Sequence, residues 1–264
     1  MKAQQVHTLT CCLQRCIWIV CCLILSTSFA HGEWRFVGVP FANFTADKGL
    51  GYGVFGSAFS RASKTSGRPY ELAFEGQFYQ TTQNYAFHKL KIDYPADGYR
   101  LSLVSGWENW DTAPYYGSGA HSIRDLSRPQ EYYQIGLSSL WLQPQLRHHL
   151  WSELEGVFLV TLRNVTVQNE MNLLSMLKPQ GLEGGRLLMY ALGLTIDTRD
   201  QEPTPTAGYW IEATVGMADE ILGSEFNTQY ANLTHRHWWS LDQHSRFVLA
   251  SRTMIDVQRN APFF

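Results

Sequence analysis

The residues best placed to do chemistry lie in one charged segment, IDTRDQEPTPTAGYW, residues 196–210. Asp197 and Arg199 are two positions apart, so on a strand they would point to the same side and could form an ion pair. Such pairs are usually structural, although unusual charges also mark functional sites. We therefore expect this motif to fix the fold and register of two strands, with a direct role in transport as the alternative. The motif residues are Asp197, Thr198, Arg199, Asp200, Gly208 and Tyr209.

Two histidine pairs raise the question of a metal site. His235 and His237 lie two positions apart in a predicted strand, so both would face the same way and could chelate an ion. No spaced cysteine or acidic partner accompanies them, which favours a polar role beside the neighbouring tryptophans. His148 and His149 are adjacent and would face opposite sides. The sequence thus predicts no metal ion and no cofactor.

Ser118 and His121 offer the residue types of a serine nucleophile and its base, in a glycine-rich loop. The chain has no G-x-S-x-G elbow. Residues 49–53 are glycine-rich but open a strand without the lysine of a phosphate loop. We therefore expect no catalytic residue and no enzymatic activity, and we keep an outer-membrane hydrolase as an alternative.

Charge and cysteine usage narrow the class of protein. The formal net charge of -2 argues against nucleic acid as a partner, because phosphate binding needs a basic patch. All five cysteines lie in the first 22 residues, so the body has neither a disulfide framework nor a thiolate metal site. Residues 1–30 have a positive start, an apolar core and small residues before Ala30, which predicts a signal peptide cleaved near Ala30. An uncleaved N-terminal anchor is the alternative.

Period-two alternation of apolar and polar residues dominates the rest of the chain, and no apolar run there is long enough for a membrane-spanning helix. One helical piece is expected at residues 169–177. The candidate strands, with 34–44 as a further one, are 50–60, 70–80, 85–95, 98–108, 131–143, 150–163, 187–198, 208–218, 226–239 and 246–257.

The alternating stretches place apolar side chains on one face and small or polar ones on the other, as where Leu192 opposes Gly193. In 131–143 the odd positions, including Ile135 and Trp141, form the apolar face. A soluble sandwich would bury that face, whereas a membrane barrel would turn it to lipid. Strands of about 9 to 11 residues with aromatic residues at their ends favour the barrel.

The sequence therefore predicts a single all-β domain over residues 31–264, an antiparallel transmembrane β-barrel with about 10–11 strands present. Its polar face, which carries Asp197 and Arg199, would line the lumen. A glycosidase pair among the lumenal carboxylates stays open as a possibility. The carboxylates expected to face the lumen are Glu71, Glu75, Glu153, Glu155 and Glu212.

Residues 193–218, GLTIDTRDQEPTPTAGYWIEATVGMA, resemble the strand–turn–strand of the bacterial surface-antigen outer-membrane barrels, which include BamA-like and TamA-like proteins. Members carry an Asp-Thr-Arg-Asp segment, a proline-containing turn and a glycine followed by an aromatic residue. Residues 39–59 and 246–264 are similar to the family's opening strand and to its Leu-Ala strand, so the likeness covers nearly all of 36–264. The segment PYYGSGAHS is similar to the family's aromatic-Gly-x-Gly loop, here Tyr116, Gly117 and Gly119.

This resemblance implies insertion of proteins into, or translocation across, the bacterial outer membrane, with membrane lipid and client outer-membrane or secreted proteins as partners. Members usually carry POTRA modules before the barrel, and the few residues between 30 and 36 leave no room for one. A passive pore or lipid-interacting barrel is therefore an alternative, as is a soluble periplasmic β-sandwich that binds a ligand. Because family barrels continue to about sixteen strands, we expect this chain to be a partial, C-terminally truncated barrel.

Overall fold

The computed structural model describes residues 34–62, 69–117, 124–168, 172–202 and 204–264. Eleven antiparallel strands form one sheet in which each strand pairs with its neighbours in the chain. The elements are β1 (Trp34–Thr45), β2 (Gly49–Ser60), β3 (Ala73–Thr81), β4 (Tyr85–Ala96), β5 (Tyr99–Pro114), the 3₁₀ helix η1 (Gln130–Tyr133), β6 (Gln134–Trp151), β7 (Leu154–Gln168), α2 (Leu173–Leu177), β8 (Gly184–Asp197), β9 (Gly208–Ala218), the 3₁₀ helix η2 (Glu220–Leu222), β10 (Thr228–Ser240) and β11 (Val248–Arg259).

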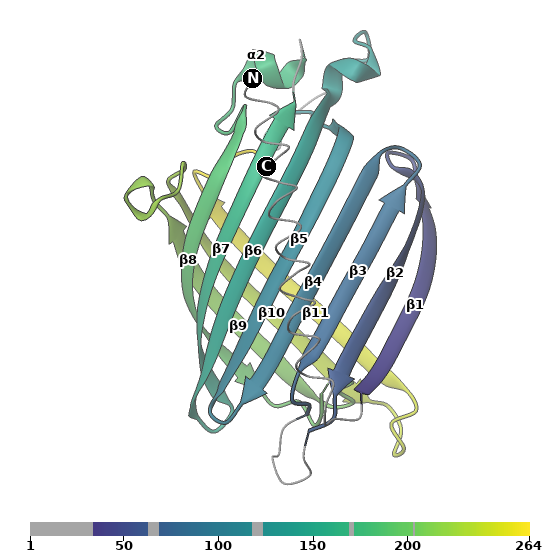
Figure 1. Ribbon diagram of the computed structural model, residues 1–264, viewed down its shortest axis with the longest axis vertical. Coiled ribbons are helices and arrows are strands. Elements are labelled where there is room, and N and C mark those ends of the chain that lie inside the picture. The colour runs from purple at the N-terminus through teal and green to yellow at the C-terminus, as the bar shows by residue number, and fades with distance from the viewer. Residues whose placement is uncertain (1–33, 63–68, 118–123, 169–171, 203) are drawn as a thin grey trace.

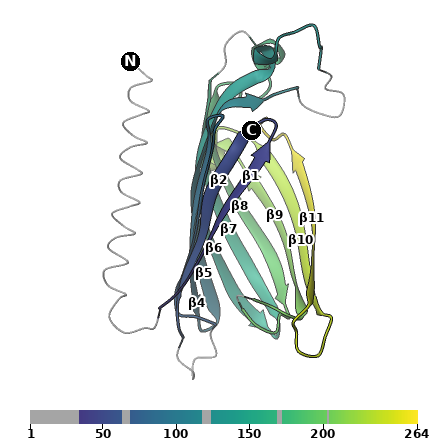
Figure 2. The ribbon, with the colours of Figure 1, turned by 90° about the vertical axis from the view of Figure 1, so that its right-hand side faces the viewer.

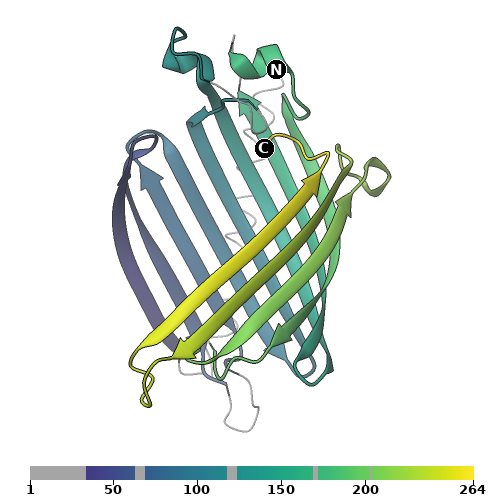
Figure 3. The ribbon, with the colours of Figure 1, turned by 180° about the vertical axis from the view of Figure 1, so that it is seen from behind.

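The strands are tilted relative to the long axis of the molecule, and the sheet that they form is strongly curled (Figure 1). Figures 2 and 3 show that β9–β11 form a wall opposite β1–β5, with the sheet open between β1 and β11. We call the concave face of this sheet its lumenal face and the convex face its outer face. The predicted all-β, antiparallel barrel architecture is confirmed, as a partial barrel whose two edges are β1 and β11.

The strand predictions hold best where turn signals are sharp. The predicted strand 208–218 coincides with β9, and the candidate strand 34–44 is β1. The strands β5, β6 and β7 are longer than predicted, at 16, 18 and 15 residues. Lengths of this order exceed the ~9–11 residues that a tilted strand needs to cross a hydrocarbon layer.

The outer face carries the apolar side chains, as the barrel hypothesis requires. On β8 and β9, Leu192 is 63% exposed, Leu194 51% and Val215 63%. Their lumenal neighbours Ala191 and Thr195 are buried. A sandwich would cover the apolar face with a second sheet, yet the described strands belong to one sheet. The alternative of a soluble β-sandwich is therefore wrong.

The assignment of faces was wrong in β6. Trp141 is the register partner of Gly106 on β5, and a Cβ built on Gly106 would lie 2.1 Å from the Trp141 ring. Trp141 and the other odd positions therefore face the lumen. The outer face of β6 is instead formed by even positions such as Leu142 and Leu146, which are exposed. The first predicted residues of this strand, 131–133, belong to η1.

Apolar residues in the lumen explain this error. An apolar cluster that includes Leu174 of α2 lies at the end of the lumen next to that helix, and the odd positions of β6 contribute to it. A β-bulge in β5 between Trp110 and Ala113 shifts the register there. The buried members are Ala113, Tyr115, Ile135 and Leu174, with Trp110, Leu137, Val167, Leu173, Leu182 and Phe263 packed against them.

The predicted helical piece at 169–177 is observed in part as α2, while residues 169–171 lie outside the described residues. Asn172 caps the helix by accepting a hydrogen bond from the backbone N–H of Ser175, at 3.0 Å. The cap presents Leu174 to the apolar cluster, where its side chain is fully buried. In the described part of the chain, no helix has the length and apolar character needed to cross a membrane.

Candidate functional site: a charged network at one end of the lumen

The Asp-Thr-Arg-Asp motif begins at the last residue of β8, and Gly208 begins β9. The two strand ends are tied by Thr198, whose backbone N–H donates to the Tyr209 carbonyl at 2.9 Å. Gly208 has φ 94°, and a Cβ at this position would lie 2.2 Å from the Thr198 carbonyl oxygen. The close approach of the two backbones therefore requires glycine at position 208.

Asp197 and Arg199 form the ion pair that their spacing suggested. Arg199 Nη2 lies 2.5 Å from Asp197 Oδ2, and Arg199 Nε donates to Asp197 Oδ1 at 2.8 Å. Arg199 Nη2 also contacts Glu202 Oε1 in the same turn. Burial alone would lower the pKa of Arg199, but the hydrogen bond with Asp197 and the charge of Glu202 raise it.

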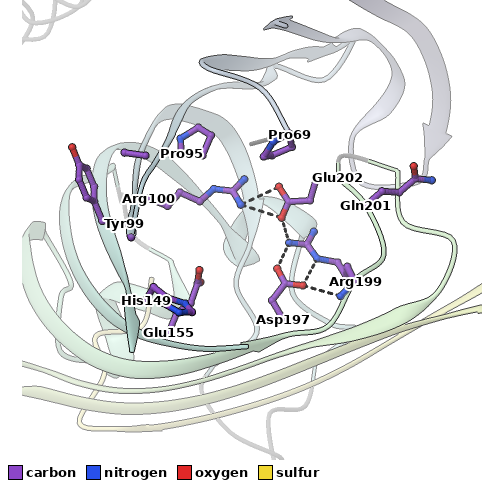
Figure 4. A pocket seen from close by; sticks show the side chains of 12 residues that line it. Pro69, Pro95, Tyr99, Arg100, His149, Glu155, Asp197, Arg199, Gln201 and Glu202 are labelled. Atoms are coloured by element: carbon purple, nitrogen blue, oxygen red, sulfur yellow. Dashed lines mark hydrogen bonds and ion pairs between the residues drawn. The ribbon is translucent and has the colours of Figure 1, made fainter. Parts of the chain in front are cut away.

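Glu202 connects this turn to a strand far away in the sequence. Arg100 Nη1, on β5, lies 3.0 Å from Glu202 Oε1 and 3.0 Å from Oε2. Figure 4 shows Glu202 between Arg100 and Arg199, with Asp197 on the far side of Arg199. The turn between β8 and β9 is thereby held against the lumenal face of β5.

Asp93 on β4 anchors the other side of Arg100. It is 1% exposed, and its Oδ2 lies 2.7 Å from Arg100 Nη2 and accepts from Arg100 Nε at 2.9 Å. The hydroxyls of Tyr70 and Ser102 each donate to Asp93 at 2.5 Å. A buried carboxylate is stable only when such partners replace its water. Burial raises the pKa of Tyr70, and the negative charge of Asp93 raises it further.

Asp200 organises the turn rather than the lumen. Its Oδ1 accepts from the Thr206 N–H at 2.9 Å and from the Ala207 N–H at 3.2 Å, and the Thr206 hydroxyl donates to Oδ2 at 2.6 Å. These bonds stabilise the charged carboxylate, led by the one from the Thr206 hydroxyl, and lower the pKa of Asp200 to about 2.

A cavity of about 540 Å³ borders the network. Its walls come from three connections, β2–β3, β4–β5 and β8–β9, and from the adjoining ends of strands β4 to β8. Figure 4 shows the side chains that line it. Arg100, His149 and Arg199 supply basic groups, and Glu155 and Glu202 supply acidic ones. Four charged side chains of this wall are paired with one another: Arg100, Asp197, Arg199 and Glu202.

Further into the lumen, Glu212 on β9 forms a second polar centre. Its Oε2 accepts from the Thr195 hydroxyl at 3.2 Å and from Gln145 Nε2 at 3.4 Å. Arg147 Nη2 lies 3.5 Å from the same oxygen. This carboxylate faces the lumen, as predicted.

The remaining predicted carboxylates differ in position. Glu75 pairs with Lys91 at 3.7 Å on the lumenal face, and Glu155 lines the cavity, as predicted. For Glu71 and Glu153 the prediction was wrong: Glu71 is an exposed residue ahead of β3, and Glu153 lies in the turn between β6 and β7. The prediction assumed that the alternation of the strands continues into these connections, where the chain is no longer extended.

The aromatic-Gly-x-Gly loop follows β5 directly. The Tyr116 ring packs on Tyr133, with centroids 5.4 Å apart, and Gly117 has φ 98°. Gly119, Ser118 and His121 lie outside the described residues. The described part of the loop is thus packed on η1.

The two histidines of β10 pair in register with Ile211 and Tyr209, on the outer face of β9. The His237 ring stacks on Trp239 at 3.8 Å between centroids. Among the described residues, no group of three or more histidine, cysteine or acidic side chains could hold a metal ion.

Sequence reasoning did not identify Tyr70 or Asp93 as members of the network. Asp93 falls in phase with the lumenal lysines of β4, which was a usable signal for a lumenal charge. Tyr70 lies before β3, and its contact with Asp93 depends on how the connection folds back.

Neither a known protein family nor a curated protein matches the sequence. A solved structure is similar: the crystal structure of BamA from Haemophilus ducreyi lacking POTRA domains 1-3, with a TM-score of 0.50, 13% sequence identity and 87% of this chain covered. The chain has a BamA-like outer-membrane barrel fold. The fold expected from the Asp197–Tyr209 motif is thereby confirmed.

The match covers 41% of that BamA chain, so this chain spans less than half its length. The predicted signal peptide over residues 1–30 lies outside the described residues and stays a prediction. The functional roles expected for the motif residues also stay predictions.

Proposed function

We propose that this BamA-like barrel acts in the insertion of proteins into, or their translocation across, the bacterial outer membrane. The observation that carries the proposal is the edge strand β1 (Trp34–Thr45) on a sheet whose apolar face points outward. An edge strand presents unpaired N–H and C=O groups, which can pair with a strand of another chain. In a lipid environment such pairing gains most, because no water competes for those groups.

The connections support one orientation in the membrane. The long connections between β5 and β6 and between β7 and β8 lie at one end, and the charged network lies at the other. Outer-membrane barrels generally place short turns in the periplasm and long loops outside. The charged network would then face the periplasm. The apolar cluster beneath α2 would close the lumen at its opposite end, which faces the outside of the cell.

Folding of a client barrel into liposomes tests this role. The proposal predicts faster client folding in liposomes that contain the chain than in empty ones. The variant Ala42→Pro, in phase with Pro40 and opposite the even residue Tyr52, removes a backbone donor from the open edge of β1 and should lose part of that gain. Phe158→Leu, on the outer face of the inner strand β7, is the matched control and should retain it. Equal client folding rates with and without the chain would contradict the proposal.

A passive pore is the second candidate, because the lumenal face is lined by charged and amide side chains that suit a water-filled channel. Planar-bilayer conductance separates the two candidates: open channels without any effect on client folding would favour the pore. The expected partners in both cases are outer-membrane lipid and, for insertion, client proteins, with no nucleic acid, no cofactor and no catalysis.

A further inference from the structure

Two arginines are cross-strand neighbours in the wall formed by β9–β11. Arg236 on β10 and Arg252 on β11 are register partners, and both point to the lumenal face. Like charges placed directly across a strand pair destabilise a sheet. An arrangement of this kind calls for a negative charge between or beside the two guanidiniums.

A third arginine, Arg147 on β6, lies against the same indole, that of Trp210. The Arg236 Cζ lies 5.0 Å from the Trp210 ring centroid, and the Arg147 Cζ lies 5.4 Å from it. Guanidinium groups bind aromatic faces in this geometry, which leaves their N–H edges free to meet an anion. The two guanidiniums of Arg147 and Arg236 are therefore held on one indole.

Several donor groups of these arginines lack a strong acceptor. The Nε atoms of Arg147 and Arg236 are buried without a hydrogen-bond partner. Arg252 Nη2 contacts the Met254 sulfur at 3.3 Å, and thioether sulfur is a weak acceptor. In the described part of the chain, no ion pair joins Arg236 or Arg252 to a carboxylate. Buried donors in proteins are normally satisfied, so these point to a missing acceptor.

The nearby carboxylates are already engaged. Glu212 accepts from Thr195 and Gln145 and pairs with Arg147. Asp197 pairs with Arg199, and Asp256 accepts from Asn232 Nδ2 at 2.5 Å. We define Arg147, Arg236 and Arg252 as the arginine cluster, which carries more positive charge than Glu212 can balance.

We propose that the arginine cluster binds a tetrahedral oxyanion of the phosphate type, supplied by a soluble phosphate in the lumen. Guanidiniums bind phosphate through paired N–H donors, and a dianion with several oxygens can accept from more than one arginine at once. The cluster lies on the lumenal face, whereas lipid meets the outer face, so a free anion rather than a lipid headgroup is the ligand. Binding would offset the repulsion between Arg236 and Arg252.

Equilibrium dialysis of inorganic phosphate against the full chain, folded in phosphate-free detergent micelles, tests the site. Saturable binding is expected, and sulfate should compete while chloride at the same concentration should not. Arg236→Gln should weaken binding at least tenfold, and Arg252→Gln should weaken it as well. Arg259→Gln removes the same charge from the outer face of the same strand β11 and should leave affinity unchanged.

Each outcome decides the proposal. The absence of saturable binding to folded protein, equal loss in Arg236→Gln and Arg259→Gln, or displacement by chloride at the same concentration would overturn it. Short-chain phosphatidic acid presents phosphate on a lipid, and stronger competition by it than by inorganic phosphate would overturn the free-anion source. Heat-modifiable migration on a gel shows that each variant is folded. Because client folding is not measured here, failure of this site leaves the proposed insertion role untouched.

Discussion

The two faces of the sheet are stabilised in different ways. On the outer face, apolar side chains such as Leu162, Leu192 and Val215 stay exposed. On the lumenal face, Asp93 and Arg100 are held by several defined contacts each. The stability of the outer face therefore depends on an apolar solvent around it. The stability of the lumenal face depends on particular hydrogen bonds and ion pairs.

The largest effect is expected from making the lumenal face apolar at Arg100. The substitution Arg100→Leu would leave Asp93 buried without its cation and free Glu202 from β5, which should lower the free energy of unfolding by about 3–5 kcal/mol. Urea titration of the protein in micelles measures the change. Arg259→Leu makes the same substitution on the outer face and should cost nothing measurable. Similar losses in both variants would erase the distinction between the faces.

The converse substitution places a charge on the outer face. Leu162→Arg, near the middle of β7, should destabilise the bilayer-folded protein by about 2–4 kcal/mol, as for charged residues at the lipid midplane. Its neighbour Thr161 lies on the lumenal face, where it accepts a hydrogen bond from Gln143. Thr161→Arg is thus the control and should cost clearly less, as the lumenal Arg163 of the same strand indicates. A larger loss for Thr161→Arg than for Leu162→Arg would mean that the faces are reversed.

A smaller effect is expected at Tyr70. Tyr70→Phe removes one hydrogen bond to a charged carboxylate, a loss of about 2 kcal/mol. Because the pKa of Tyr70 is raised above its ordinary value of 10.0, its contribution is complete below pH 10.0 and is lost as the pH rises further. The difference in unfolding free energy between wild type and Tyr70→Phe should therefore shrink above pH 10.0. A difference that stays constant into strong alkali would show that the Tyr70–Asp93 bond does not contribute.

The smallest effect concerns the exposed turn. The pKa of Asp200 is lowered from 3.8 to about 2, so its stabilisation is present above pH 3.8 and is lost as the pH falls towards 2. The protection factor of the Thr206 amide, the ratio of its intrinsic to its observed exchange rate, should fall over this range in the wild type. In Asp200→Asn the protection factor should show no such step. A step of the same size in Asp200→Asn would assign the titration to another group.

The sequence located the strands, apart from some of their ends, and the short-range pairs. Alternation located β9 and its outer residues, and a spacing of two positions placed Asp197 beside Arg199. It failed at β6, where Ile135 is apolar because it packs beneath α2 in the lumen. Periodicity reports that two faces differ and cannot tell an internal apolar cluster from a lipid-facing surface.

Long-range partners were beyond sequence reasoning for a physical reason. Arg100 and Glu202 are 102 residues apart and meet because the sheet curls and the turn after β8 folds over the lumen. The opposition of Arg236 and Arg252 likewise depends on the register of β10 and β11. One residue of slip would move either arginine to the outer face.

The most direct test of an outward apolar face is a nitroxide scan of five consecutive positions in β7. All native cysteines lie within the first 22 residues, so single cysteines at 158–162 can be labelled in a protein without its first 30 residues. In bilayers, labels at Phe158, Val160 and Leu162 should be accessible to oxygen, and labels at Leu159 and Thr161 to a water-soluble nickel complex. Protection of all five from both reagents would place these side chains in a packed centre and contradict the account.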